Sequence, residues 1–325
     1  AVAPTDSSAG KPTADPLPSA FEAPLSLPLA DPAPRLTNAS AVLLREIAVQ
    51  DEFGQQRSLH IPAERALTVF VDRQELVTLM TLGACPELLV LGYLCNQRLI
   101  GTAAEVESIT VDWDVGAAAV KTRHGIADLQ ARTARRVVTT GCGQGTVFGD
   151  LMAQVDSLQL PDAARARIRQ ATLYAMLERM RQRHSIHRKA GSVHGCALFE
   201  GSRMLVAVED VGRHNAIDTI AGWMWMNPEA TSAAPSTQAG QTDTASFQPM
   251  GGADKVFYTT GRLTSEMVIK SAQMGVPIVV SRSGMTQMGH AVAQQLGLCA
   301  IGRATNRRFV CYAGAHRLVL QPELA

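Results

Sequence analysis

Short apolar stretches and helix-length stretches alternate through the second half of the sequence, and this alternation constrains the fold more than any other feature. Cys196–Phe199 and Met204–Val208 predict a β-hairpin, and a helix is expected to begin near Asn215. The elements expected after it are a strand at Val256–Tyr258, a helix at Ser265–Met274, a strand at Pro277–Val280, a helix at Gln287–Leu296, and strands at Leu298–Ile301 and Phe309–Tyr312. Strands that alternate with helices of this length predict an α/β layer fold with at least partly parallel pairing.

The predicted strands of this region end in small and polar residues. Arginine recurs at three successive strand ends, in Gly261-Arg262, Ser281-Arg282-Ser283 and Gly302-Arg303. Ligands of α/β folds collect at the carboxyl ends of strands, and arginine binds phosphate oxygens through a planar fork of donors. The recurrence favours a site for an anionic ligand such as a pyrophosphate. The simpler alternative is that loops between strands and helices are polar in any case.

The first half of the chain predicts a second structured region. Leu67–Val71 has the pattern of a strand, and Pro86–Leu94 is apolar and long enough for a helix. Pro161-Asp162 is expected to open a further helix that continues to about Arg183. Arginines alternate with apolar residues along this helix, and we interpret them as a solvated face.

Two segments have the composition of disordered chain. Residues 1–40 are rich in Ala, Pro, Ser and Asp, and residues 227–254 are rich in Ser, Thr, Ala, Gln and Gly. The sequence therefore predicts a disordered tail over 1–40 and an N-terminal subdomain over 41–160. The α/β core is expected over 161–325, with a disordered insertion at 227–254.

Composition argues against several classes of protein. The 325 residues are 46% hydrophobic and 18% charged, which is typical of a soluble globular protein, and a net charge of +1 argues against a general nucleic-acid or membrane-surface role. No apolar run approaches the ~20 residues of a transmembrane helix, and the first residues lack the pattern of a secretory signal. The six cysteines form no C-x-x-C pair, which favours a reducing cytoplasm over a disulfide framework or a zinc ribbon.

Cys142 has surroundings unlike those of the other five cysteines. It lies in the run T-T-G-C-G-Q-G at 139–145, directly after Val137-Val138, which we expect to lie in a strand. The flanking glycines leave the thiol accessible, and a helix start expected at Thr146-Val147 would lower its pKa. The other five lie in apolar stretches, where cysteine acts as a small buried hydrophobe. Cys142 is therefore the candidate reactive thiol.

Several separate stretches occur in the order found in one known family. These stretches are Gln74–Met80, Leu91–Leu94, Glu209–Asp218 (EDVGRHNAID), Gly261–Val268 (GRLTSEMV) and Val280–Ser283. Together they resemble the formate dehydrogenase accessory sulfurtransferases, the FdhD family. The resemblance spans about Arg57 to Arg317, outside the tail and the insertion.

The resemblance implies a function in the maturation of formate dehydrogenase. Members of the family take sulfur from a cysteine desulfurase and carry it as a persulfide on a loop cysteine. They relay it to the bis(molybdopterin guanine dinucleotide) cofactor, bis-MGD, with molybdenum or tungsten as the metal, for the catalytic subunit of formate dehydrogenase. The implied fold is a cytidine deaminase-like α/β core, a mixed sheet with flanking helices, plus a smaller N-terminal subdomain. A cytoplasmic homodimer is also implied, with a guanine nucleotide as a surrogate ligand.

The resemblance also implies which residues form the site. Cys142 matches the carrier cysteine, and the cofactor segment corresponds to Arg303, Ala304, Thr305, Asn306, Arg307 and Arg308. Further candidate cofactor contacts are Arg213, His214, Arg262, Ser281, Arg282 and Ser283. Arg213 and His214 lie at an expected helix start, where amides and side chains can share an anion. The alternative makes Arg213 an ion-pair partner of Asp210 and His214 a helix cap.

One departure from the family pattern leaves two hypotheses open. Many members carry two cysteines as C-x-x-C in this loop, whereas the second position here is Gly145. A single thiolate suffices to carry one sulfur atom, but it cannot form a disulfide within the loop. The first hypothesis is therefore a single-thiol carrier and sulfurtransferase. The second is a chaperone that binds, protects and inserts bis-MGD without transferring sulfur.

Two further alternatives have weaker support. A zinc hydrolase needs H-x-E and P-C-x-x-C, but His194 is followed by Gly195-Cys196 and no P-C-x-x-C occurs. A metal site built from His184, His187 and His194 is likewise weak, and we expect no metal. A dinucleotide-binding loop at residues 141–149 misses the G-x-G-x-x-G spacing, because Thr146 stands at the third glycine position.

Overall fold

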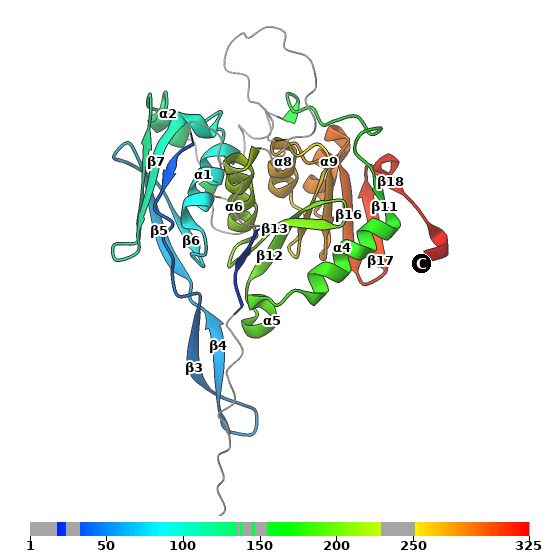
Figure 1. The fold of residues 1–325 in the computed structure, drawn as a ribbon, viewed down its shortest axis with the longest axis horizontal. Helices are drawn as coiled ribbons and strands as arrows, with labels where there is room; N and C mark the ends of the chain where they lie inside the picture. Colours follow the sequence, from blue (N-terminus) through cyan, green and yellow to red (C-terminus); the bar gives the residue numbers. More distant parts are fainter. Residues whose placement is uncertain are drawn as a thin grey trace, which may run out of the picture.

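Two large β-sheets, with helices between and around them, form most of the described part of the protein. The computed structural model describes residues 18–23, 33–134, 137–138, 145–146, 155–228 and 251–324. Helices α1 (Pro86–Asn96) and α6 (Arg213–Met226) lie between the smaller sheet, on the left of Figure 1, and the larger one on the right. None of the described helices is long and apolar enough to cross a membrane.

The larger sheet has seven strands in the order β1-β13-β12-β14-β15-β16-β17. β14, β15 and β16 run parallel, whereas the pairs on either side of them are antiparallel. The strands are β1 (Phe21–Glu22), β12 (His194–Glu200), β13 (Arg203–Asp210), β14 (Lys255–Thr259), β15 (Ile278–Ser281), β16 (Cys299–Thr305) and β17 (Arg308–Ala313). β14 and β15 are buried along their whole length, as expected for central strands that are covered on both faces.

Helices cover both faces of this sheet. α6, α8 (Ser265–Gln273) and α9 (Gln287–Leu296) pack on one face, and α4 (Gln170–Gln182) packs on the other. Successive residues of a strand point to opposite faces, so β14 contributes Phe257 to the first core and Tyr258 to the second. The result is a three-layer α/β/α core whose parallel strands all end at one edge.

The smaller sheet has five strands in the order β2-β7-β8-β5-β6. Its strands are β2 (Arg35–Leu36), β5 (Arg65–Val71), β6 (Gln74–Thr81), β7 (Val106–Asp112) and β8 (Ala117–Thr122). α1 covers one face of the sheet, and Leu89 and Leu94 of the helix share a core with Leu67 and Ile109 of the strands. The opposite side of α1 packs on α6, which joins the smaller sheet to the larger one.

Two glycines allow α1 and α6 to approach each other closely. A β-carbon at Gly92 would lie 1.7 Å from the backbone oxygen of Asp218, and one at Gly222 would lie 2.0 Å from that of Leu88. No side chain fits at such a distance, so both positions require glycine. Nearby, a buried chain of contacts links α1, α6 and α8: Asn96 donates a hydrogen bond to Asp218, which forms an ion pair with Lys270.

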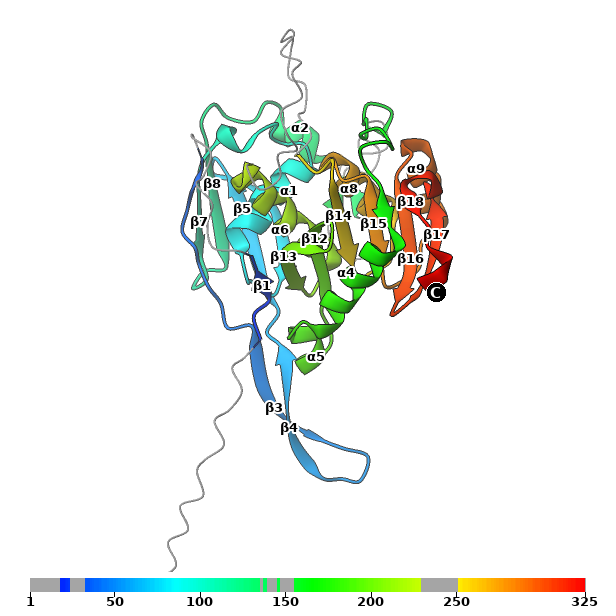
Figure 2. The ribbon, with the colours of Figure 1, turned by 45° about the vertical axis from the view of Figure 1, so that its right-hand side comes forward.

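Several short elements complete the described fold. β3 (Leu44–Gln50) and β4 (Gln56–Pro62) form a separate ribbon that projects from the body (Figure 2). The remaining strands are β9 (Val137–Val138), β10 (Gly145–Thr146), β11 (Ile168–Arg169) and β18 (Leu318–Val319), paired β9 with β10 and β11 with β18. The remaining helices are α2 (Leu129–Ala134), α5 (Ile186–Ala190) and the 3₁₀ turns η1 (Ala103–Glu105), η2 (Ala315–Arg317) and η3 (Pro322–Leu324).

Most of the elements predicted from the sequence are present. Every strand and helix predicted between Cys196 and Tyr312 is found, with ends that differ by a few residues. The strand predicted at Leu67–Val71 and the helix predicted at Pro86–Leu94 are also found, as β5 and α1. The predicted α/β fold with partly parallel pairing is therefore confirmed.

Three predictions need correction. The tail is not disordered throughout, because Phe21–Glu22 pairs with β13 and Arg35–Leu36 pairs with β7. The helix expected from Pro161 begins only at Gln170, after Ile168–Arg169 has paired with β18. Thr146 lies in β10, opposite Val137, rather than at a helix start. Most of the predicted insertion, 229–250, lies outside the described residues.

Candidate functional site

A cavity of about 1210 Å³ opens where β14, β15 and β16 end. One wall is formed by α4 and the chain that follows it, and the other by residues at the ends of the strands. The lining residues from the first wall include Tyr174, Leu177, Glu178, Met180, Arg181, Arg183, His187 and Arg188. Those from the strands include Gly195, Glu209, Tyr258, Thr260, Arg282, Ala304, Thr305, Asn306 and Arg307.

The charged lining of this cavity favours anions. Five arginines line it against two glutamates, and each glutamate is already paired: Glu178 with Arg181, and Glu209 with Arg183. The three remaining arginines form no ion pair with the described residues, and these are Arg188, Arg282 and Arg307. Guanidinium groups left free in a concave site are suited to phosphate or pyrophosphate.

Hydrogen bonds hold the three predicted strand ends side by side. The Ser281 hydroxyl donates to the carbonyl of Gly261 at 2.7 Å. The backbone N–H of Arg303 donates to the carbonyl of Ser283, also at 2.7 Å. Arg282, between them, lines the cavity. The exposed Arg262, the buried Ser281 and the partly buried Ser283 lie outside its lining. That these strand ends meet at one edge is therefore observed, and their binding of a ligand stays a prediction.

The predicted cofactor segment 303–308 is a tight connection between β16 and β17. The strand does not end at Ile301 as expected, but continues to Thr305 before the chain turns. Arg303 and Asn306 have positive φ angles, of 52° and 53°. Ala304–Arg307 lines the cavity, and the guanidinium carbon of Arg307 lies 6.0 Å from the ring centre of Tyr174. Arg303 and Arg308, both exposed, lie outside the lining.

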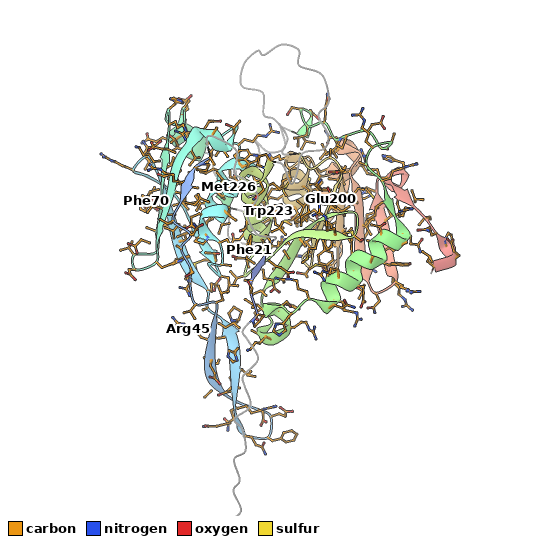
Figure 3. All side chains as sticks on the ribbon, viewed as in Figure 1. Phe21, Arg45, Phe70, Glu200, Trp223 and Met226 are labelled. Carbon is orange, nitrogen blue, oxygen red and sulfur yellow. The ribbon has the colours of Figure 1, made fainter. Side chains whose placement is uncertain are left out.

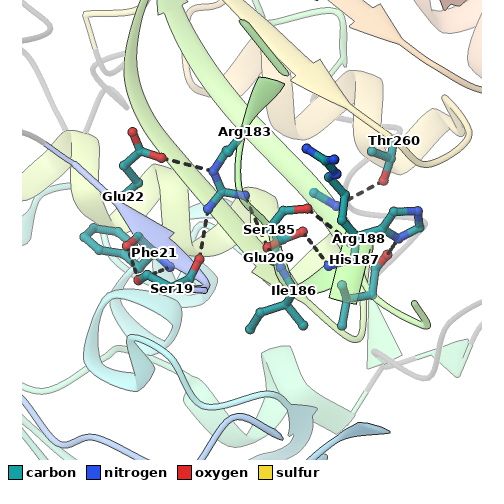
Figure 4. A network of polar contacts seen from close by, with 12 residues as sticks. Ser19, Phe21, Glu22, Arg183, Ser185, Ile186, His187, Arg188, Glu209 and Thr260 are labelled. Carbon is teal, nitrogen blue, oxygen red and sulfur yellow. Dashed lines mark hydrogen bonds and ion pairs between the residues drawn. The ribbon is translucent and has the colours of Figure 1, made fainter. Parts of the chain in front are cut away.

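A buried ion pair fixes the end of α4 against the sheet (Figure 4). Arg183 Nη1 lies 3.2 Å from Glu209 Oε2, and the side chains are 5% and 2% exposed. The Glu209 carboxylate also accepts the backbone N–H groups of Ile186 and His187, at 2.8 and 3.1 Å. Arg183 reaches β1 as well, through Glu22 at 3.2 Å. Our interpretation of the arginines of this region as a solvated face is therefore wrong for Arg183.

Arg213 and His214 lie at the start of α6, as predicted, but both are buried and neither lines the cavity. His214 Nε2 lies 3.3 Å from Glu266 Oε2 at the start of α8. Burial, together with nearby Lys270 and Arg213, holds the pKa of His214 well below its usual range. The Asp210 carboxylate accepts hydrogen bonds from Thr81, Leu82, Gly212 and Asn215.

The described cysteines behave mostly as core residues. Burial raises the pKa of Cys85 and Cys196 to about 12 and that of Cys95 well above its usual value, so these thiols are protonated. Cys311 is half-buried, and a hydrogen bond with Cys299 lowers its pKa to about 7. Its Sγ–H group also donates a hydrogen bond to the carbonyl of Ala313, at 3.3 Å. Cys142 lies outside the described residues, between β9 and β10 in the sequence.

Comparison with known proteins places the chain in a family. The model of the FdhD/NarQ family matches residues 62–319, which is most of the chain. The chain belongs to the FdhD/NarQ family.

Individual relatives of this FdhD/NarQ protein agree with the family match. The sulfur carrier protein FdhD of Bacillus subtilis is 28% identical over 255 residues, covering 78% of this chain and 88% of the relative. That of Listeria innocua is 24% identical over 264 residues, covering 81% and 93%. A crystal structure from Desulfotalea psychrophila, described as a formate dehydrogenase accessory protein, has a similar fold with a TM-score of 0.62 and 22% identity. The match covers 85% of this chain and 98% of the chain in that structure.

Sequence reasoning missed one wall of the cavity. Tyr174, Glu178 and Arg181 were not candidates, because their spacing on α4 fits an ordinary helix face. Glu209 lies in the motif EDVGRHNAID, which resembles the FdhD family. No residue near Glu209 in the sequence indicates its partner Arg183, which lies 26 residues earlier in the chain.

Proposed function

We propose that this protein is a sulfur carrier in the maturation of formate dehydrogenase, acting on the bis-MGD cofactor of that enzyme. The family match over 62–319 is the observation that carries the proposal, and the names of the relatives agree with it. The cavity at the strand ends is a second, independent support. It has the size, the position and the free cations that a nucleotide-containing ligand requires.

Sulfur transfer is assigned to Cys142. The thiolate attacks the outer sulfur of a persulfide on a cysteine desulfurase, the donor S–S bond breaks, and the donor cysteine leaves as a thiolate. Cys142 then carries the sulfur as a persulfide until a second transfer delivers it to the cofactor. Gly145 leaves no second thiol in the loop, so each cycle carries one sulfur atom and forms no disulfide there.

The described cavity offers groups for the nucleotide part of bis-MGD, which is the cargo of the carrier. Arg282 and Arg307 would face the phosphates, and Tyr174 offers an aromatic face beside Arg307. Arg213 and His214, which we expected to contact the cofactor, are buried against α8 and would act only through the shape of the strand ends. A guanine nucleotide such as GDP is therefore the simplest surrogate ligand.

The sulfur step is tested by intact mass. The protein is incubated with a cysteine desulfurase and cysteine, and we expect one added sulfur atom that a reductant removes. Cys142→Ser should abolish the adduct, whereas Cys311→Ser, the matched control at the half-buried described thiol with a lowered pKa, should retain it. An adduct that survives Cys142→Ser and disappears in Cys311→Ser would transfer the carrier role to β17.

The cavity is tested by calorimetric titration with GDP. Arg282→Ala removes a charge-assisted contact and should weaken binding about 10-fold or more. Arg303→Ala is the matched control, because Arg303 is an exposed arginine near the end of the neighbouring strand β16 but lies outside the cavity lining. Equal loss in both variants would indicate general charge attraction rather than a site.

A cofactor chaperone without sulfur transfer is the second candidate. It is favoured by Arg282 and Arg307, which form no ion pair with the described residues, and by the Tyr174 ring in the cavity lining, because these groups suit the binding of a nucleotide and have no part in the transfer of sulfur. This candidate predicts normal GDP binding, no sulfur adduct, and full formate dehydrogenase activity with Cys142→Ser in a strain that lacks its own carrier. The carrier predicts an adduct and loss of that activity.

We further infer a cytoplasmic location and a core of the cytidine deaminase type. The order of elements supports the second inference: the antiparallel pair β12–β13 is followed by α6, β14, α8, β15, α9 and β16. The cytoplasmic location is supported by the proposed sulfur donor, a cysteine desulfurase of the cytoplasm. It is also supported by the six cysteines, which contain no C-x-x-C pair in the sequence.

A further inference from the structure

Residues 18–23, which we call the strap, contain the short edge strand β1 of the larger sheet and lie outside the family match, which begins at residue 62. Only two residues of β1 pair with β13. The carbonyl of Ala20 extends this pairing, because it accepts the backbone N–H of Glu209 at 2.7 Å. So short a strand has little stability of its own, and the side chains of the strap must hold it in place.

The side chains of the strap alternate between the two faces of the larger sheet, as strand geometry requires. Phe21, labelled in Figure 3, packs against the core on the side of α6. Ala20 is fully buried and shares a small core with Ile186 of α5 on the other side. Glu22, on the same side as Ala20, reaches Arg183 at the end of α4. The strap therefore contacts the α4–α5 wall of the cavity.

Arg183 joins the strap to this wall through all three nitrogens of its guanidinium group (Figure 4). Nε donates to the Glu22 carboxylate and Nη2 to the carbonyl of Ser19, each at 3.2 Å. Nη1 lies 3.2 Å from the Glu209 carboxylate. Two of the three contacts thus come from the strap. Without it, two donors of a side chain that is only 5% exposed would lose their acceptors, which is costly, so we expect Arg183 to turn toward water and release Glu209.

The same contacts fix the part of the chain that lines the cavity after α4. Glu209 accepts the backbone N–H groups of Ile186 and His187, and the Ser185 hydroxyl accepts that of Arg188 at 3.2 Å. His187 and Arg188 line the cavity, and Arg188 forms no ion pair with a described residue. A cation whose backbone is fixed before an anion arrives binds that anion more tightly, because less freedom is lost on binding.

We propose that the strap positions the α4–α5 wall for the ligand of the cavity, with Glu22 as a positioning residue that acts through Arg183. This role rests on the proposed function, because the ligand is the nucleotide-containing cargo assigned to the cavity. It adds to the site a segment from outside the family match. A protein whose strap is displaced should keep both sheets and bind the ligand less tightly, since only a fraction of the molecules then has the wall in place.

Charge reversal at Glu22 tests this role in calorimetric titrations of the full-length protein with GDP. Glu22→Lys sets a cation beside Arg183 and Arg179, so the strap should detach and the dissociation constant of GDP should rise about 5-fold or more. General attraction between charges predicts the opposite, a tighter complex, because the variant adds positive charge near an anion site. Glu22→Asp, the conservative variant, should retain most of the affinity.

Glu52→Lys is the matched control for this titration. It makes the same change of charge at a side chain that is 73% exposed, on the projecting β3–β4 ribbon and outside the cavity lining. We expect it to bind GDP like the wild type. The midpoint of urea unfolding should be the same for Glu22→Lys and Glu52→Lys, because both residues are exposed and the loss of affinity arises at the wall.

Hydrogen exchange, measured by mass spectrometry, tests the wall without any ligand. Ala20→Asp places a carboxylate at a fully buried position, so the strap should leave the sheet. We expect the amides of Ile186 and His187 to exchange about 10-fold faster or more, while those of β14 and β15 keep their protection. Ala119→Asp, at an exposed alanine of β8, is the matched control and should not change exchange in α5.

The two measurements separate the strap from the proposed function. If the wild type does not bind GDP, the assignment of the cavity fails, and exchange at Ile186 and His187 still decides whether the strap holds the wall. Unchanged exchange at these amides overturns the proposal, and so does GDP binding by Glu22→Lys that is as tight as in the wild type or tighter. Should Ala20→Asp not fold, exchange is measured on Glu22→Lys, whose altered side chain is at a position 47% exposed.

Discussion

At the scale of single residues, Arg183 holds one wall of the cavity in place. Its guanidinium compensates the buried Glu209 carboxylate and extends to Glu22 of β1. Arg183→Ala would leave Glu209 buried without its counter-ion, which typically costs about 3–5 kcal/mol. We expect the free energy of unfolding, measured with urea, to fall by that order.

The neighbouring Arg181 provides the control for this prediction. It belongs to the same helix and also pairs with a glutamate, but its side chain is 64% exposed. Arg181→Ala should change the stability by less than about 1 kcal/mol, because exposed ion pairs contribute little. If the two variants lost the same amount of stability, the pair between Arg183 and Glu209 would have no special structural weight.

His214 gives the protein a dependence on pH. Its pKa in the folded protein lies well below 6.5, chiefly because the ring is buried, and Lys270 and Arg213 add to this. The unfolded chain therefore binds more protons than the folded one below about pH 6.5, so stability is lost as the pH falls through that value. The expected slope is up to about 1.4 kcal/mol per pH unit until the folded pKa is reached.

This slope is measured as a difference between two proteins. Glu266, beside His214, acts in the opposite sense, because burial raises its pKa and favours its protonated form in the folded state. The free energy of unfolding of the wild type and of His214→Gln is measured with urea at several pH values between 5 and 7. These values lie on both sides of the ordinary histidine pKa of about 6.5, so the difference between the two proteins isolates the contribution of the histidine. The difference in stability should shrink towards low pH. A constant difference would mean that the ring can be protonated in the folded protein.

At the scale of elements, the contact between α1 and α6 depends on glycine. In Gly92→Ala the new methyl group would lie within 1.7 Å of a backbone oxygen of α6, and neither helix can move without opening a core. We expect a loss of more than about 3 kcal/mol, or failure to fold, in thermal or urea unfolding. Gly212→Ala is the control: its β-carbon would find only ordinary contacts at 3.7 Å, so that variant should stay within about 1 kcal/mol of the wild type.

Elements were predicted well wherever their pattern is local. The β12–β13 hairpin and α9 follow from periodicity, because each has its turn or cap beside it in the sequence. β1 and β2 could not be predicted, since each is two residues long and is stabilised only by a distant strand, β13 or β7. The delayed start of α4 has the same cause, because Ile168–Arg169 pairs with β18 some 150 residues away.

The candidate site divides along the same line. The strand end at Arg282 was predicted, because the rule that places ligands at the carboxyl ends of parallel strands needs only the order of elements. Ala304–Arg307 was expected from the family resemblance alone, and Arg303, which the strand-end rule indicated, lies outside the lining. The wall contributed by α4 depends on which face of the sheet the helix covers, and the sequence of α4 does not contain that information. Arg213 and His214 carried a family motif, yet their burial against Glu266 appears only when α6 and α8 are placed side by side.

At the scale of the whole molecule, the two sheets share their helices and do not form separate units. Leu88 and Trp225 each pack against both the core of the larger sheet and that of the smaller one. Lys270 in α8, Asp218 in α6 and Asn96 in α1 form a buried polar chain across the same boundary. The boundary that we expected near residue 160 is therefore a boundary in sequence that is crossed by both packing and hydrogen bonds.

This shared core predicts that the protein unfolds in a single transition. Separating the sheets would expose Trp225 and leave the Asp218–Lys270 pair without Asn96, so neither half gains by remaining folded alone. Tryptophan fluorescence reports on the boundary through Trp223 and Trp225 and on the smaller sheet through Trp113, and far-ultraviolet circular dichroism reports on all helices. We expect the two signals to follow the same urea curve. Two separated transitions, or a fluorescence change that precedes the loss of helix, would mean that the smaller sheet opens independently of the α/β core and its cavity.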